Sequence, residues 1–188
     1  MRRLRFSPAL LLALALGACD NDASGPSASV TVRIQDSPFS DARAVLVTFS
    51  EVSAHRSGEG DFAPIPFSPA SSTRTCDLKK LESAQDVLAA GALSEGHYTQ
   101  LRLKISEASI FFDNEASGTA CGSTIAAPDG ASAPLDIPSG EITLNREFDV
   151  NNEAAMTITL DFEGEQSIHQ TGEGTFMLQP VISVVSVE

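Results

Sequence analysis

Cys76 and Cys121 are two cysteines that could form a disulfide or supply a reactive thiol. A nucleophilic cysteine needs a histidine or another positive group beside it to form the thiolate. The chain has three histidines against a background of 25 Asp and Glu. In an exported protein two such cysteines are expected to pair. We therefore predict a Cys76–Cys121 disulfide and keep a catalytic cysteine as the alternative.

His55, His97 and His169 are the next candidates, because imidazole groups bind metals and transfer protons. They lie on three separate segments, and no two of them have the spacing of metal ligands. The sequence contains no Gly-x-Ser-x-Gly, His-Glu-x-x-His or phosphate-binding loop. Asp161 and Glu163 point out of one expected strand, where a solvated pair is expected. We therefore predict no catalytic residue, no metal site and no cofactor.

Calcium is the one ligand that the acidic composition suggests. Asp149, Asn151 and Glu153 alternate as oxygen ligands do at the start of a calcium loop, and residues 113–115 form a second acidic turn. However, Ala154 replaces the glycine at the sixth position, and Leu160 replaces the glutamate at the twelfth. We predict that these turns are solvated and bind no calcium specifically.

The start of the chain predicts export. Arg2, Arg3 and Arg5 precede an apolar run over residues 10–16 that is too short to span a bilayer. The run ends in Leu16-Gly17-Ala18-Cys19, which resembles a bacterial lipobox. Cleavage before Cys19 and its acylation would anchor the chain, because each buried methylene group contributes about 0.8 kcal/mol. Residues 1–18 are thus expected to be a lipoprotein signal peptide, and residues 19–29 a flexible tether.

The charge of the chain limits its partners. The net charge is −13, and loss of the signal peptide would make it −16, because three arginines and no acidic residue are removed. Such a surface disfavours nucleic acid and anionic lipid. The absence of Trp and the single Tyr weaken stacking on sugars. The expected partners are membrane lipid through the acylated Cys19 and an unidentified envelope protein or glycan, with no nucleic acid.

The elements that position these residues are mostly strands. The stretch from Leu93 to Ile105 alternates between two sets of side chains, which predicts a central strand with one buried face. The buried set is Thr99, Leu101, Leu103 and Ile105, and the solvent-facing set is Tyr98, Gln100, Arg102 and Lys104. Gly96 can adopt positive φ before this strand, and Tyr98 can bond the backbone as a tyrosine corner does. Further strands are expected over residues 30–34, 43–55, 62–67, 108–112, 133–137, 142–144, 147–150, 155–163 and 175–187. The second of them is expected to have a bulge near Ser50 and Glu51.

One short helix is expected after Ser83. Leu81, Ala84, Val87 and Leu88 have helical spacing, and Gly91 could end the helix. Many short strands with a single helix predict an all-β fold, a two-sheet sandwich of the immunoglobulin or transthyretin-like type, over residues 30–188 as one domain.

Several segments resemble an uncharacterised family of bacterial and archaeal lipoproteins, classed as a domain of unknown function and similar to DUF4382. The resemblance rests on residues 32–38, 41–52, 96–103, 160–162 and 178–182. It implies a β-sandwich and carries no known catalytic residue. The chain departs from the family most at the Cys76 and Cys121 pair and at residues 77–81.

Two functional hypotheses remain open at this point. The first is a membrane-anchored lipoprotein of the bacterial cell envelope that acts as a non-enzymatic binding or structural module. The second is a metal-dependent or hydrolytic enzyme with its site on the sandwich loops. A convergent cleft of histidines and carboxylates would favour the second hypothesis.

Overall fold

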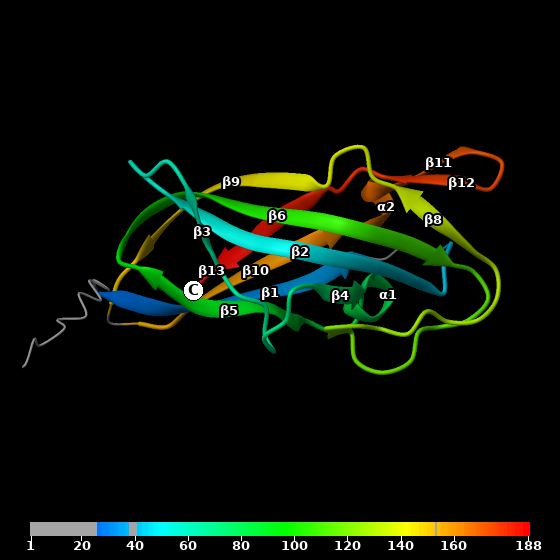
Figure 1. Ribbon diagram of the computed structural model, residues 1–188, viewed down its shortest axis with the longest axis horizontal. Coiled ribbons are helices and arrows are strands. Elements are labelled where there is room, and N and C mark those ends of the chain that lie inside the picture. The colour runs from blue at the N-terminus through cyan, green and yellow to red at the C-terminus, as the bar shows by residue number, and fades with distance from the viewer. Residues whose placement is uncertain (1–25, 38–40, 153) are drawn as a thin grey trace, which may run out of the picture.

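The computed structural model describes residues 26–37, 41–152 and 154–188, which form strands and two helices of four residues each (Figure 1). The elements are β1 (Ser27–Ser37), β2 (Ala44–Arg56), β3 (Phe62–Pro64), β4 (Arg74–Asp77), α1 (Leu78–Leu81), β5 (Asp86–Ser94), β6 (Gly96–Phe111), β7 (Cys121–Gly122), β8 (Ser132–Asp136), β9 (Glu141–Val150), β10 (Met156–Glu163), α2 (Gly164–Ser167), β11 (Ile168–Gly172), β12 (Thr175–Leu178) and β13 (Ile182–Val187).

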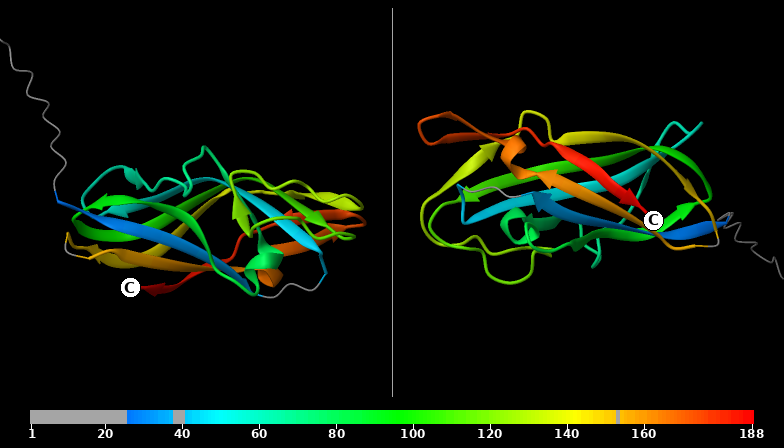
Figure 2. Two further views of the ribbon diagram at one scale, coloured as in Figure 1. Left: turned by 90° about the horizontal axis from the view of Figure 1, so that it is seen from below. Right: turned by 180° about the vertical axis from the view of Figure 1, so that it is seen from behind.

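The strands form a β-sandwich of two sheets, which confirms the predicted fold class. The four-stranded sheet has the order β13-β10-β1-β5. The nine-stranded sheet follows the order β11-β12-β8-β6-β2-β4-β7, with β3 paired to β2 and β9 paired to β6. Figure 2 shows the two layers from the side and from behind. No helix in the described ranges is long and apolar enough to cross a membrane.

Strand β1 is the centre of the smaller sheet and is longer than predicted. Val30, Val32 and Ile34 are fully buried, because their alternation places all three on the face that meets the other sheet. β1 pairs in parallel with β10 and antiparallel with β5. Its first residue, Ser27, lies opposite Ser94, so the chain enters the sandwich beside the β5–β6 turn.

The central pair of the larger sheet is β2 with β6. The register shifts between Phe49 and Glu51, which confirms the predicted bulge. β6 is one strand of 16 residues, whereas the sequence predicted two strands. Exposed Ser106 and Glu107 interrupt its alternation at a bulge, because Glu107 pairs with Thr48 and Ile105 with Phe49 while Ser106 has no paired residue in β2. Pairing with β2 continues on both sides of this bulge. Similarly, β9 is a single strand where two were predicted.

Tyr98 lies in the core and not on the solvent face with Gln100. The register with β9 shifts between these two residues, and the irregularity turns the Tyr98 ring inward, where 1% of the residue is exposed. Gly96 has φ of +152°, as its place in the turn requires. The prediction of the turn is confirmed, and the predicted direction of the Tyr98 side chain is wrong.

The helix predicted after Ser83 is wrong. Residues 86–94 form β5, and the nearby helix is α1, which begins after Asp77. The Asp77 carboxylate caps α1 by accepting the Lys79 N–H at 3.2 Å. β5 is extended because it pairs along β1, and this long-range pairing outweighs the local helical spacing. A second short helix, α2, and the strand β11 were not predicted; both lie between the strands expected over residues 155–163 and 175–187.

The end of the chain passes from one sheet to the other. The sequence predicted one strand over residues 175–187. Instead, β12 belongs to the larger sheet and β13 to the smaller one, and Pro180 lies in the crossing between them. Proline has no N–H to donate to a continuous ladder, so the strand divides here.

Candidate functional site

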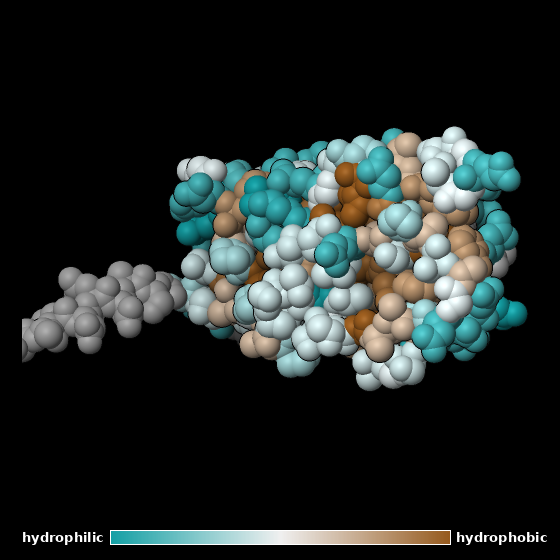
Figure 3. Space-filling model, turned by 45° about the vertical axis from the view of Figure 1, so that its right-hand side comes forward, coloured by the Kyte–Doolittle hydropathy of each residue, from teal (hydrophilic) through white to brown (hydrophobic). Residues whose placement is uncertain are grey.

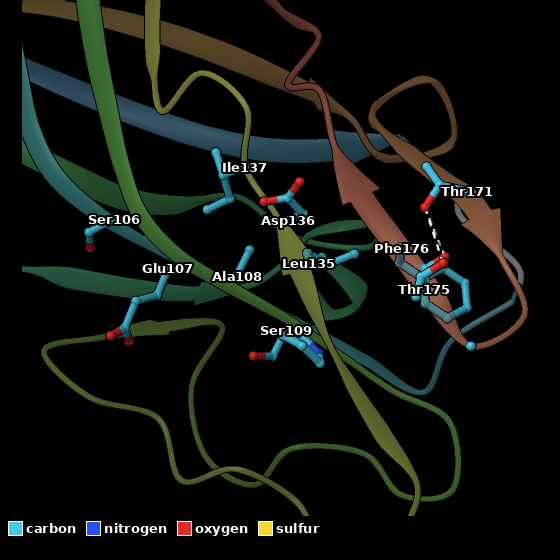
Figure 4. A pocket seen from close by; sticks show the side chains of 12 residues that line it. Ser106, Glu107, Ala108, Ser109, Leu135, Asp136, Ile137, Thr171, Thr175 and Phe176 are labelled. Atoms are coloured by element: carbon cyan, nitrogen blue, oxygen red, sulfur yellow. Dashed lines mark hydrogen bonds between the residues drawn. The ribbon is translucent and has the colours of Figure 1, made fainter.

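A groove of about 880 Å³ opens between β6, β8 and the β11–β12 hairpin (Figure 4). It lies at the end of the sandwich where α1 and α2 are found, away from the start of β1 (Figures 1 and 2). None of the predicted site residues lines this groove. The residues that do line it come from separate parts of the chain and meet only because the strands converge here.

The groove exists because the pairing along β6 is interrupted. β6 pairs with β9 as far as Lys104 and with β8 only from Ser109, so residues 106–108 belong to neither register. The connection from β8 to β9 approaches β6 at Gly140, whose carbonyl accepts the Ile105 N–H at 2.7 Å. A Cβ atom at Gly140 would collide with the Ile105 carbonyl oxygen, so a glycine is needed at this contact.

The groove joins polar groups to an apolar floor. Figure 4 shows Glu107 projecting from β6 and Asp136 from β8. In the β11–β12 hairpin, the Thr171 hydroxyl donates to the Thr175 hydroxyl at 3.2 Å. The other lining residues are Ser106, Ala108, Ser109, Pro134, Leu135, Ile137, Gly174 and Phe176.

The charge of the groove is negative. Its twelve lining residues include two carboxylates and no Lys, Arg or His. A neutral or cationic ligand could bind here, with hydroxyl groups as hydrogen-bond partners and Phe176 and Leu135 as apolar contacts. An anionic ligand would meet like charge with no compensating cation in the lining.

A charged network lies on the outer face of the larger sheet. Glu51 accepts hydrogen bonds from Arg102 at 2.6 Å and from Ser53 at 2.7 Å, and Lys104 is 2.8 Å away. Burial opposes ionisation of Glu51, but these partners together outweigh it and lower its pKa to about 2. Arg102 also lies 4.0 Å from the centre of the Phe62 ring, a cation–π contact. The network holds β2, β3 and β6 together.

Asp36 and Asp77 are buried carboxyl groups that bind the backbone. Asp36 accepts the Gly164 N–H at 3.1 Å and so joins β1 to α2. Burial raises the pKa of Asp36 to about 8, against the effect of this hydrogen bond. Asp77 accepts the Val45 N–H at 3.1 Å, and burial raises its pKa as well. Each has a second oxygen buried without a partner in the described structure. Neither lines the groove, so both act as structural links.

The predicted disulfide is present and joins β4 to β7 through Cys76 and Cys121. Asp86 of β5 accepts the Cys121 N–H at 2.9 Å and lies 3.7 Å from the buried guanidinium of Arg74. Burial lowers the pKa of Arg74, and Asp86 counters this effect. The bridge therefore fixes the loop after β6 to β4, and the hydrogen bond to Asp86 connects that loop to the smaller sheet.

The three histidines do not meet. His55 contacts Thr99 and the Glu59 carbonyl, and His97 lies 2.8 Å from Asp149. His169 is on β11, far along the chain from both. Within residues 26–37, 41–152 and 154–188, no three His, Cys, Asp or Glu side chains are grouped so as to hold a metal. Asp149 and Asn151 are described, whereas Glu153 and Cys19 lie outside the described residues.

The groove residues were not predicted from the sequence, although one signal indicates them. Ser106 and Glu107 are two consecutive polar residues that break the alternation of β6. This break predicts the end of a strand. In the structure the strand continues, and the break is a bulge against β2 that lies where β6 has left β9 and has not yet met β8.

Comparison with known proteins gives one match. Residues 27–180 match the family described as "Domain of unknown function (DUF4382)". The match covers most of the chain and nearly all of the sandwich. No curated protein and no solved structure matches the chain.

Proposed function

This chain belongs to the DUF4382 family, and we propose that it is a lipid-anchored, non-enzymatic binding module of the bacterial cell envelope. The observation that carries the proposal is the order of features at the start of the chain. Three arginines, an apolar run and the segment Leu16-Gly17-Ala18-Cys19 follow one another as they do in a lipoprotein signal. The Cys76–Cys121 disulfide supports export, because disulfides persist in oxidising compartments.

The direction of β1 supports a role for the far end of the sandwich. Ser27 is at the end where the tether would join, and Ser37 is at the opposite end (Figure 1). A strand of 11 residues spans about 36 Å. A domain held at Cys19 and standing upright would therefore direct the groove away from the membrane, towards other components of the envelope.

The groove supports binding more than catalysis. It offers hydroxyl groups, two carboxylates and an apolar floor, and none of its twelve described lining residues is a histidine or a cysteine. The ligand that fits best is neutral or cationic and has an apolar part, such as a segment of an envelope protein or a glycan. Nucleic acid fits poorly, because both the groove and the chain as a whole are acidic.

The anchor is tested by replacing Cys19 with serine in the full chain. The expected result is an unprocessed precursor or release of the protein from the membrane fraction. Asp22→Ser, a change in the tether that leaves the motif intact, is the control and should remain membrane-bound at the mature mass. Mature, membrane-bound Cys19→Ser protein would refute the anchor.

The groove is tested separately with a photo-reactive amino acid in place of Thr175 in the full chain. The control position is Ser57, an exposed residue in the turn after β2, at the other end of the molecule. An adduct is expected at Thr175 and not at Ser57, and Glu107→Lys with Asp136→Lys should abolish it if the ligand is cationic. No adduct at Thr175 would reject the groove and leave the anchor untouched, whereas an adduct that survives the charge reversal would reject a cationic ligand.

A further inference from the structure

The edge strand β13 carries the exposed apolar side chains of the described surface. Among the described residues, Val181 and Val185 are the large hydrophobic residues that are exposed, by 39% and 54%. Val181 directly precedes β13 and Val185 lies within it. Figure 3 shows a mixture of polar and apolar areas on the face that it depicts. The two exposed valines therefore lie along one edge, one just before β13 and one within it.

Among the described strands, β13 pairs only with β10, so its outer edge has no hydrogen-bonded neighbour there, unlike the other edge of the same sheet. The opposite edge, β5, is covered in part by the segment before β4, since Ala90 N–H donates to the Pro66 carbonyl at 2.9 Å and Phe67 bridges to Ala89. An open edge exposes unpaired backbone groups that another strand can bind.

The sequence of this edge lacks the charges that discourage pairing. Residues 174–187 contain no Asp, Glu, Lys or Arg, in a chain of net charge −13. The nearby edge strand β9 is different, because it carries Glu141, Arg146, Glu147 and Asp149. Two copies of so acidic a chain repel each other over most of their surfaces, and the uncharged β13 edge is a place where they can approach.

The exposed side chains of the edge are also complementary to themselves. Val181, Ser183 and Val185 alternate with less exposed residues and share one face. The register between β10 and β13 shifts near Val185, which helps to keep this side chain out of the core. If two edges pair antiparallel with Ser183 opposite Ser183, Val181 of each copy lies opposite Val185 of the other. Both exposed valines then lose solvent contact.

We propose that β13 is a homotypic docking edge, through which two copies of this chain pair antiparallel about a two-fold axis at Ser183. The pairing does not depend on the groove, whereas the concentration of the chains in the envelope rests on the proposed lipid anchor. An interface of one strand from each copy is smaller than the roughly 1,200 Å² of a stable complex. The dimer is therefore weak in dilute solution and forms where the chains are concentrated, as in the envelope.

The test is cysteine cross-linking of the full chain in the envelope of expressing cells. Opposed residues in an antiparallel pair have Cα atoms about 4.5–5.5 Å apart, within the range of a disulfide. Ser183→Cys is expected to give at least five times more covalent dimer after mild oxidation than Ser94→Cys, which is at the other edge of the sheet. Co-expressed Val181→Cys and Val185→Cys chains should cross-link to each other, but neither should do so alone.

A second set of variants tests the surface without relying on a new thiol partner. In the Ser183→Cys background, Val185→Glu or Val181→Glu should lower the dimer at least five-fold, whereas Ala92→Glu on β5 should not. Thermal melts establish that each variant is folded. The proposal is overturned if Ser183→Cys gives no more dimer than Ser94→Cys, if the glutamate variants leave the dimer unchanged, or if the main product contains a different protein.

Discussion

The Tyr98 hydroxyl donates a hydrogen bond to the Ser94 carbonyl oxygen, 3.0 Å away, across the turn at Gly96. The Tyr98 ring is stacked on Phe148, with centroids 5.2 Å apart and an angle of 7° between the planes. Burial raises the pKa of Tyr98, so the hydroxyl remains a donor at physiological pH. The bond joins the end of β5 to the start of β6, and thus links the two sheets.

Tyr98→Phe should therefore lower the free energy of unfolding by about 1 kcal/mol, because it removes the hydrogen bond and keeps the ring. Tyr98→Ala should cost about 3–5 kcal/mol, because it also leaves a cavity beside Phe148. Urea unfolding of the two variants measures both values. Equal losses in the two variants would contradict this division between hydrogen bond and packing.

Removal of the disulfide should lower the free energy of unfolding by about 4 kcal/mol in the chain-entropy model, because the bridge joins residues 45 apart. The double variant Cys76→Ala with Cys121→Ala avoids burying a new polar group where Cys76 is fully buried. Urea midpoints with and without reductant measure the effect. Reductant should destabilise the parent protein and leave the double variant unchanged; a response of the variant to reductant would point to another cause.

Asp36 should make the protein less stable as the pH rises. Its pKa is about 8 in the folded protein and 3.8 as the ordinary value, so between these values the folded chain holds a proton that the unfolded chain loses. Stability is then lost over the window from about pH 4 to pH 8, by at most about 6 kcal/mol.

Asp36→Asn keeps the acceptor for the Gly164 N–H and removes the ionisation. The variant should be more stable than the parent at pH 8, and the difference should shrink towards pH 4. Asp61→Asn, at an exposed position, is the control for loss of one negative charge. Unfolding curves at several pH values measure the slope. A difference between Asp36→Asn and the parent that does not vary with pH would refute the assignment.

Glu51 should change the pH dependence of stability in the opposite direction to Asp36. Its pKa is lowered from 4.5 to about 2, so its contribution is present above about pH 4.5 and is lost as the pH falls towards 2. Glu51→Gln should cost about 1–3 kcal/mol at pH 7, because Arg102 and Lys104 lose a charged acceptor. The same variant should show a smaller loss of stability in acid than the parent does. Acid titration followed by circular dichroism measures this, and an unchanged acid transition would count against the network.

Alternation in the sequence was sufficient to predict the strands that face one core. Val30, Val32 and Ile34 predicted β1, and the change of parity between Phe49 and Val52 predicted the bulge in β2. These patterns are local, because a strand with one buried face must repeat every two residues. The Cys76–Cys121 pair was predicted for a similarly direct reason, since few other partners were available to either thiol.

Tertiary structure decided the features that depend on a neighbour distant in the chain. Leu81, Ala84, Val87 and Leu88 have helical spacing, yet residues 86–94 form a strand, because a ladder along β1 contributes more than local propensity. Pro180 divides a run that looks continuous, because its two halves pair with different sheets. The groove depends on the gap where β6 leaves β9 before it meets β8. No single segment of the sequence contains this information, because the gap depends on the registers of β6, β8 and β9. Glu107, Asp136 and Thr175 line one groove only after the strands have paired.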